Sequence, residues 1–380
     1  MVNTMKKLGI IGSTGSIGLQ TLDIVRRHRD RYEVSTLSAK SSVDALIAQS
    51  KEFEPKVVGI FDQIHYKTVR SALGSNIDVV AGVEALKATV EDVDTVVAAV
   101  VGMQGLTSVM AAIEAGADIA LANKESLVVG GNLVMDAAKQ KGIAITPVDS
   151  EHSAVWQCLN SGRRQDVRRI ILTASGGPFR GYTKEQLLSV TLKDALKHPT
   201  WAMGQKITID SATMANKALE IIEARWLFET TDIEYVVHPE SIIHSMVEFC
   251  DGSTIAQMSY PTMEIPIQLA ISSPDRLDTS VKPLDLGALS RLTFFKPDEE
   301  VFSMPAIARR CIALGGTACA VFNAANEAAN LLFRQGKIGF VDIMRIVERA
   351  IEYFRIVPLS TIDEVVALSN DVFERTPSLI

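Results

Sequence analysis

Short apolar runs alternate with amphipathic stretches over the first 146 residues, and this is the strongest pattern in the chain. Each run has the length of a buried strand, and helical periodicity separates most of them. Strands that alternate with helices are typical of a doubly wound parallel sheet. We therefore predict an α/β protein with an N-terminal Rossmann-type domain. The predicted strands are residues 8–11, 34–37, 57–60, 95–99, 119–122 and 143–147.

The pattern changes at Arg169. Longer mixed strands, such as residues 170–172 and 235–237, surround a strong helix that is expected from about Ser211 to Leu227. This mixture of strands and helices without strict alternation predicts a second, α+β domain.

Beyond about residue 274, prolines and a lack of sustained periodicity indicate a linker that crosses the surface. After Phe302 the pattern is helical, and Thr361 with Glu364 fits a capping box at a helix start. We therefore expect a C-terminal helical bundle. The predicted division is a nucleotide-binding domain at 1–149, a central catalytic domain at 150–274, a linker at 275–300 and the helical domain at 301–380.

The composition excludes several classes of protein. Apolar residues make up 47% and charged residues 22%, which is ordinary for a soluble protein. The net charge of −7 provides no general basic footprint for nucleic acid. No apolar run reaches the roughly 20 residues that span a bilayer, and the few residues before the first strand leave no room for a signal peptide. The four cysteines lack CxxC spacing. We expect a cytoplasmic enzyme without nucleic-acid or membrane partners.

A glycine-rich segment, GSTGSIG at residues 12–18, follows the first predicted strand and opens a helix expected from about Ile17 to Arg27. Glycine lets the backbone approach a pyrophosphate, and the helix N-terminus offers N–H groups. The spacing differs from the usual G-x-G-x-x-G, and a glycine turn can also close a strand without a ligand. Its place at the first strand-to-helix turn favours a dinucleotide site.

Two further strand ends carry candidate cofactor contacts. Lys40, Ser41 and Ser42 follow the second predicted strand, where a cation with hydroxyl groups suits a 2′-phosphate and favours NADPH over NADH. A solvated loop lysine is the alternative interpretation. Asn123 and Lys124 follow another strand, where they could lie between nicotinamide and substrate, or simply start a helix.

Asp149 and Glu151 place two carboxylates one residue apart directly after the nucleotide-binding pattern. If residues 148–153 are extended, both side chains project to the same side and form a seat for a hard divalent cation. A solvated strand end is the alternative. Glu220, four residues after Asn216 on the predicted helix, would be the third carboxylate.

Candidate phosphate contacts gather near the start of the same helix, where Asp210 or Ser211 could serve as the N-cap. Ser211, Asn216 and Lys217 offer hydroxyl, amide and ammonium donors that suit a phosphate monoester. Ser175, in a Ser-Gly-Gly-Pro turn, is a second candidate, although such a turn also has a purely structural use.

Residues 198–204 combine His198, Trp201 and Met203 in a segment that ends at Gly204. Such a segment could close as a lid over substrate and exclude water. An ordered loop that buries its tryptophan is the alternative.

In combination, these segments resemble one family, 1-deoxy-D-xylulose 5-phosphate reductoisomerase. The resemblance implies metal-dependent rearrangement and NADPH-dependent reduction of 1-deoxy-D-xylulose 5-phosphate to 2-C-methyl-D-erythritol 4-phosphate, in the non-mevalonate route to isoprenoid precursors. It also implies a homodimer and Mg²⁺, Mn²⁺ or Co²⁺ as the cation. The matching segments are GSTGSIG at 12–18, LANKESLV at 121–128, PVDSEHSA at 147–154, ASGGPF at 174–179, HPTWAMG at 198–204, DSATMANKALE at 210–220, EARWLF at 223–228, HPESIIHSMV at 238–247 and FNAANE at 322–327.

The resemblance also implies roles for individual residues. The metal ligands would be Asp149, Glu151 and Glu220. The catalytic set would comprise these three residues with Lys124 and His198. Contacts to substrate would come from Lys124, Ser150, Glu151, Ser175, His198, Trp201, Met203, Ser211, Asn216, Lys217 and Glu220. Contacts to NADPH would come from Thr14, Gly15, Ser16, Ile17, Asn123, Glu125 and Gly204, together with the residues 40–42.

One position departs from the family pattern. The family often has Gly-Lys-Asn after the second strand, whereas this chain aligns Lys40-Ser41-Ser42 there, so the lysine is shifted by one place. Two alternative functions also stay open: an NADP-dependent semialdehyde or homoserine dehydrogenase, and an NADP-sensing regulator without catalysis. The dehydrogenase does not explain three carboxylates beside a phosphate pocket, and NADPH oxidation that requires both the keto-sugar phosphate and a divalent ion would exclude the regulator.

Overall fold

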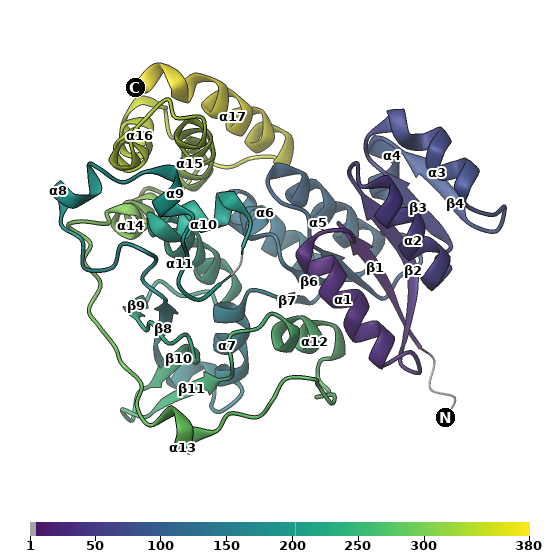
Figure 1. Cartoon of the computed structure of the whole chain (residues 1–380), viewed down its shortest axis with the longest axis horizontal. Coiled ribbons are helices and arrows are strands. Elements are labelled where there is room, and N and C mark those ends of the chain that lie inside the picture. The colour runs from purple at the N-terminus through teal and green to yellow at the C-terminus, as the bar shows by residue number, and fades with distance from the viewer. Residues whose placement is uncertain (1–4, 202) are drawn as a thin grey trace. The chain divides into compact units, whose positions relative to one another are not determined.

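The computed structural model describes residues 5–201 and 203–380, and its contacts divide the chain into two compact units (Figure 1). The first unit comprises the chain up to Ser126, residues 134–153 and residues 262–282. The second comprises residues 127–133, 154–261 and 283–380. The predicted domain boundaries at residues 149, 274 and 300 stay a prediction, because these two units are defined only by compactness and not by function.

A seven-stranded parallel sheet forms the centre of the first unit, in the order β4-β3-β2-β1-β5-β6-β7. This sheet confirms the predicted Rossmann-type fold. The short edge strand β4 was not predicted. The strands are β1 Lys6–Ile11, β2 Tyr32–Ala39, β3 Val57–Ile60, β4 Asp78–Ala81, β5 Thr95–Ala98, β6 Asp118–Leu121 and β7 Ile145–Pro147.

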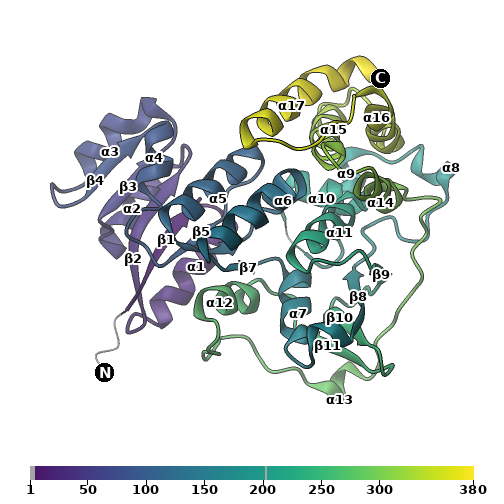
Figure 2. The same ribbon diagram turned by 180° about the vertical axis from the view of Figure 1, so that it is seen from behind.

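Helices cover both faces of this sheet: α1 and α2 lie on the face nearer the viewer in Figure 1, and α5 lies on the face nearer the viewer in Figure 2. The core between sheet and helices is aliphatic, with Leu8, Ile10, Leu22 and Leu37 fully buried. The helices are α1 Ser16–Arg27, α2 Val43–Phe53, η1 Gln63–His65, α3 Tyr66–Ala72, α4 Val83–Ala88, α5 Met103–Ala115, α6 Lys124–Lys141 and α12 Glu264–Ser272.

Helix α12 shows that the chain enters the first unit a second time. Ile267 and Ile271 of α12 belong to the same buried cluster as Leu22 of α1. Lys6 Nζ also donates a hydrogen bond to the Ile271 carbonyl oxygen at 3.0 Å. Apolar burial therefore ties residues 262–282 to the first unit, although α12 lies within the predicted central domain at 150–274.

A four-stranded sheet in the order β11-β10-β8-β9 forms the second unit together with a set of helices. Strand β10 runs antiparallel to β8 and β11, whereas β8 and β9 are parallel. The strands are β8 Val167–Ala174, β9 Ile233–Val237, β10 Ile243–Phe249 and β11 Thr254–Met258. The helices are α7 Ser150–Leu159, whose start falls in the first unit, η2 Arg164–Asp166, α8 Lys184–Leu187, α9 Leu192–Ala195, α10 Gln205–Ala212, α11 Ala215–Leu227, α13 Leu286–Leu289, α14 Met304–Leu314, α15 Ala318–Arg334, α16 Phe340–Tyr353, α17 Ile362–Arg375 and η3 Thr376–Leu379.

The C-terminal part is helical, as predicted, and α15 lies between α16 and α17 in both views (Figures 1 and 2). Thr361 caps α17 by accepting a hydrogen bond from the Glu364 amide at 3.2 Å. Gly315 ends α14 with a positive φ of 67°, a conformation that glycine adopts without strain. Within residues 5–201 and 203–380, no helix is long and apolar enough to cross a membrane.

Candidate functional site

The glycine loop connects β1 to α1 at the carboxyl edge of the parallel sheet. Its backbone is anchored to the neighbouring strand, because the amides of Gly12 and Ser13 both donate to the Ser38 carbonyl oxygen, at 3.0 and 2.9 Å. A Cβ atom at Gly18 would lie 2.5 Å from the Gly12 carbonyl oxygen, so the first turn of α1 packs directly on the loop. Gly15 and Ser16 are exposed at the helix N-terminus. This is the geometry of an anion site.

Most of the other predicted cofactor residues lie at the same edge of the sheet, whereas Gly204 begins α10 in the second unit. Lys40, Ser41 and Ser42 follow β2, the parallel neighbour of β1, and all three are exposed. Asn123 follows β6 and caps α6 by accepting from the Ser126 amide at 2.9 Å. Its side-chain amide donates to Glu125 Oε2 at 2.8 Å. Asn123 therefore starts a helix, and it also holds the Glu125 carboxylate.

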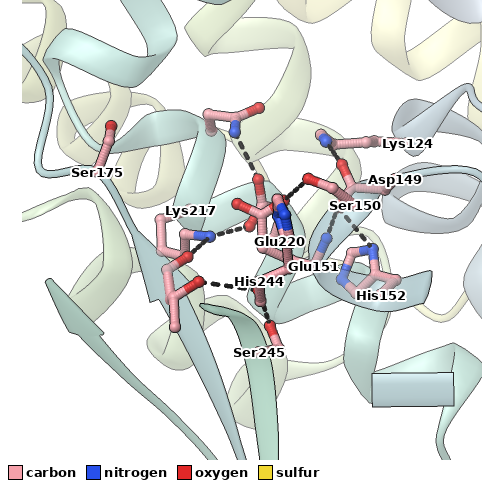
Figure 3. A network of polar contacts seen from close by, with 12 residues as sticks. Lys124, Asp149, Ser150, Glu151, His152, Ser175, Lys217, Glu220, His244 and Ser245 are labelled. Atoms are coloured by element: carbon pink, nitrogen blue, oxygen red, sulfur yellow. Dashed lines mark hydrogen bonds and ion pairs between the residues drawn. The ribbon is translucent and has the colours of Figure 1, made fainter. Parts of the chain in front are cut away.

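The structure corrects the expected geometry of the carboxylate pair. Residues 148–153 are not extended, because α7 begins at Ser150. Asp149 Oδ1 accepts a hydrogen bond from the Glu151 amide at 3.1 Å, as an N-cap side chain does. Asp149 is also ion-paired with Lys124, the first residue of α6 (Figure 3). The two carboxylates therefore approach each other around a helix start rather than along one side of a strand.

Glu220 is fully buried on α11, where two residues of the preceding turn hold it (Figure 3). Asn216 Nδ2 donates to Glu220 Oε1 at 2.5 Å, and Lys217 forms an ion pair with Oε2. Lys217 Nζ also donates to the carbonyl oxygen of Thr173 on β8. A buried carboxylate is stable only when it is paired and hydrogen-bonded, and these contacts supply both conditions.

The three predicted metal ligands come together. Asp149, Glu151 and Glu220 each offer a carboxylate oxygen, and these oxygens lie within 4.8 Å of one another. Three clustered carboxylates form an all-oxygen donor set, which Mg²⁺ and Mn²⁺ prefer over softer ligands. Asp149 and Glu220 are buried, which strengthens the repulsion among the three charges, and a divalent cation would offset that repulsion. The donor set therefore fits the implied metal.

A second polar group in the second unit joins Ser175, His198 and Ser211. His198 Nε2 lies 3.1 Å from Ser175 Oγ and 3.1 Å from Ser211 Oγ. The amides of Thr200 and Trp201 donate to His198 Nδ1, so Nε2 carries the proton of the neutral ring. Burial lowers the pKa of His198, which favours this neutral form. Ser175 lies apart from Glu220 in Figure 3, which suits a phosphate contact at a distance from the metal ligands.

The helix expected from Ser211 to Leu227 is in fact two helices, α10 and α11. They meet at Met214, which has a positive φ of 63° and acts as the N-cap of α11 without a side-chain hydrogen bond. Asp210 and Ser211 therefore lie in the last turn of α10, and neither caps α11. Gly177 explains the closeness of Ser175 and Ser211, since a Cβ atom there would lie 2.8 Å from the Ser211 carbonyl oxygen.

Within the predicted lid segment, residues 198–201 and Met203 line an open pocket of about 610 Å³ together with Leu196, Lys197 and Thr208. Ala202, within this segment, lies outside the described residues. Trp201 is half-buried, and its ring lies edge-on to His244 with a centroid separation of 6.5 Å. The segment ends where Gly204 begins α10.

A buried network around Asp210 was not predicted as part of the site. Asp210 Oδ1 accepts hydrogen bonds from Asn326 at 3.0 Å and Asn330 at 2.9 Å, and Lys206 pairs with Oδ2 at 3.1 Å. These contacts fasten α10, which carries Ser211, to α15. The sequence feature that could have revealed this network is the spacing of Asn323, Asn326 and Asn330. Burying three asparagines on one face of an otherwise apolar helix costs free energy unless their side chains have hydrogen-bond partners.

Three family models match the chain. They are 1-deoxy-D-xylulose 5-phosphate reductoisomerase at residues 8–131, its C-terminal domain at 145–228, and a DXP reductoisomerase C-terminal domain at 258–374. The chain is 50% identical over 375 residues to the 1-deoxy-D-xylulose 5-phosphate reductoisomerase of Caldanaerobacter subterraneus subsp. tengcongensis, covering 98% of each chain. It is 49% identical over 381 residues to that of Geotalea uraniireducens, covering 99% of each.

Solved structures agree with these matches over the whole chain. The reductoisomerase from Zymomonas mobilis in complex with NADPH is 42% identical, with a TM-score of 0.94 and 99% coverage of both chains. A crystal structure of DOX-P reductoisomerase in complex with NADPH, fosmidomycin and magnesium is 39% identical, with a TM-score of 0.93 and coverage of 99% of this chain and 98% of that one. With the carboxylate cluster and the glycine loop, these likenesses show that the chain belongs to the 1-deoxy-D-xylulose 5-phosphate reductoisomerase family.

Proposed function

We propose that this chain converts 1-deoxy-D-xylulose 5-phosphate to 2-C-methyl-D-erythritol 4-phosphate, with NADPH and a divalent cation. The observation that carries the proposal is the convergence of Asp149 and Glu151 with Glu220, which lies far from them in sequence, into one oxygen donor set. A dehydrogenase that only transfers hydride has no need of such a set. Family relatives solved with NADPH and magnesium support both cofactors.

Asp149, Glu151 and Glu220 would hold the cation. A bound divalent cation supplies Lewis-acid polarisation and a template for the oxygens of a keto-alcohol. The chain keeps these ligands in place through its own contacts: the start of α7 orients Asp149, Lys124 pairs with it, and Asn216 orients Glu220. Ser150 Oγ donates to Glu151 Oε2 at 2.5 Å, so this hydroxyl lies at the metal end, where it would contact a substrate hydroxyl.

The phosphate of the substrate would bind at Ser175, His198 and Ser211. The Nε2–H of neutral His198 and the two hydroxyls offer three donors without a buried positive charge. Asn216 and Lys217 lie one turn before Glu220 and would add amide and ammonium contacts to the phosphate from the end nearer the metal. Binding energy from this remote group would orient the reacting carbons, and Trp201 and Met203 on the lid would exclude water.

NADPH would bind along the carboxyl edge of the parallel sheet and, when bound, supplies the hydride. Residues 14–17 at the start of α1 would contact its phosphates, and residues 40–42 would contact the 2′-phosphate. Asn123, Glu125 and Gly204 complete the proposed contacts. The cytoplasmic location and the homodimer stay predictions from the family resemblance.

The direct test is the consumption of NADPH, followed by its absorbance, with 1-deoxy-D-xylulose 5-phosphate as substrate. We expect oxidation only when both substrate and a divalent cation are present, and loss of activity with EDTA that added Mg²⁺ or Mn²⁺ restores. Oxidation that persists in EDTA would contradict the metal assignment and favour a simple dehydrogenase. NADPH binding without turnover under any of these conditions would favour the non-catalytic regulator.

A further inference from the structure

The glycine loop has an inner contact that none of the roles above includes. Ser13 is completely buried, and its hydroxyl donates to Gln49 Oε1 at 2.7 Å. In return, Gln49 Nε2 donates to the Ser13 carbonyl oxygen at 3.0 Å. Gln49, on α2, is only 5% exposed, so one buried carboxamide pairs with both the side chain and the backbone of a single loop residue.

With this reciprocal pair, every polar group of Ser13 has a hydrogen-bond partner. Its amide donates to the Ser38 carbonyl oxygen, its carbonyl oxygen accepts from Gln49, and its hydroxyl donates to Gln49. The inner side of the loop is therefore held at two points, by β2 through Ser38 and by α2 through Gln49. Gly15 and Ser16, on the outer side, remain exposed.

Such fixation matters because backbone N–H groups bind a phosphate well only when the backbone already has the bound conformation. A loop that must be ordered during binding loses part of its affinity to that ordering. The N–H groups in the first turn of α1 have no partner inside the helix and are the groups that an anion would use. The Ser13 peptide precedes them directly, so its orientation sets theirs.

We propose that Gln49 is a positioning residue for the dinucleotide: it holds the Ser13 peptide so that Thr14, Ser16 and Ile17 present their N–H groups to the pyrophosphate, while the Gly15 amide closes the loop on the Gly12 carbonyl oxygen at 3.0 Å. This inference rests on the proposed NADPH-dependent function. It assigns to α2 a role in cofactor affinity, although Gln49 itself points away from the exposed side of the loop.

The test compares Gln49→Leu with wild type in the full-length protein loaded with Mg²⁺. Leucine is apolar and one atom shorter, so it leaves the Ser13 hydroxyl and carbonyl oxygen buried without their partner. We expect the KM for NADPH to rise about tenfold, as loss of buried hydrogen bonds would produce. The KM for 1-deoxy-D-xylulose 5-phosphate and kcat should change less than about twofold, because the carboxylates and the phosphate group are untouched.

Ser50→Ala is the matched control. Ser50 is equally buried on the same helix, but its hydroxyl donates to Leu46 within that helix, at 2.7 Å. It should leave the KM for NADPH unchanged. Ser13→Ala removes the hydroxyl and keeps the Gln49 contact to the carbonyl oxygen, so we expect about a threefold rise. In the double variant Ser13→Ala/Gln49→Leu the two effects should not multiply, because they share one contact.

An unchanged KM for NADPH in folded Gln49→Leu would overturn the inference, as would equal rises in the KM values of both substrates. If Gln49→Leu does not fold, Ser13→Ala and direct NADPH titration by fluorescence decide: affinity equal to wild type overturns the inference, and a selective loss supports it. Wild-type protein that fails to turn over substrate refutes the proposed function instead, so the two failures are distinguishable.

Discussion

Replacing Glu220 by glutamine is the sharpest perturbation of the carboxylate cluster. Glutamine keeps the shape of the side chain and the oxygen that accepts from Asn216, but it removes one of the three charges. The ligand oxygens lie within 4.8 Å of one another, so each pair of charges interacts by at least about 3.5 kcal/mol at an effective dielectric constant of about 20.

A cation among these oxygens is no farther from Glu220 and carries twice the charge. The loss of affinity for the metal should therefore be at least about 3.5 kcal/mol, or about 300-fold. Without metal, relief of carboxylate repulsion offsets the loss of the Lys217 ion pair, so the thermal stability should change little. At a Mg²⁺ concentration of about 100 times the wild-type Kd, Mg²⁺ should stabilise wild type by about 2.7 kcal/mol and Glu220→Gln by about 0.2 kcal/mol.

The assay combines thermal unfolding with and without Mg²⁺, the Mg²⁺ dependence of NADPH consumption, and NADPH binding by fluorescence. Glu223→Gln is the control, because Glu223 is a buried carboxylate on the same helix that is not among the three clustered residues. It should retain the metal response. The reasoning fails if Glu220→Gln keeps Mg²⁺ activation within about threefold of wild type, or if it loses NADPH binding while its response to metal persists.

The remaining predictions concern the residues around this cluster. Lys217→Ala should raise the KM for the substrate, and an unchanged KM in steady-state assays would refute its phosphate contact. Burial lowers the pKa of His198 below its usual 6.5, so the unfolded chain takes up a proton more readily than the folded one. The free energy of unfolding should therefore fall as the pH drops below about 6.5. Urea titrations of His198→Gln should show a weaker dependence of this free energy on pH. Asp210→Ala leaves the buried amides of Asn326 and Asn330 without their acceptor, so urea unfolding should show a loss of about 2–6 kcal/mol; a loss under about 1 kcal/mol would mean that the network contributes little.

Local patterns in the sequence account for much of the first unit. Its buried strands are continuous apolar runs, because both faces of a parallel sheet are covered, and the turn after β1 needs glycine where α1 packs on the loop. Strand β4 escaped prediction because a short edge strand provides little apolar sequence. The return of α12 to the first unit was not predicted, because the sequence of an apolar helix does not indicate which core the helix joins.

The sequence by itself determined the kinds of side chain available for chemistry, because glycine turns, clustered carboxylates and phosphate donors are visible as residue types at short spacing. Only the tertiary structure decided their arrangement. Asp149 proved to cap α7 rather than continue a strand, and Met214 separated Ser211 from the helix of Glu220. In both cases backbone hydrogen bonds and packing decide between two local backbone conformations, a strand or a helix start at Asp149 and a continuous or a broken helix at Met214. The meeting of Glu220 with Asp149 depends on long-range folding, which local periodicity does not encode.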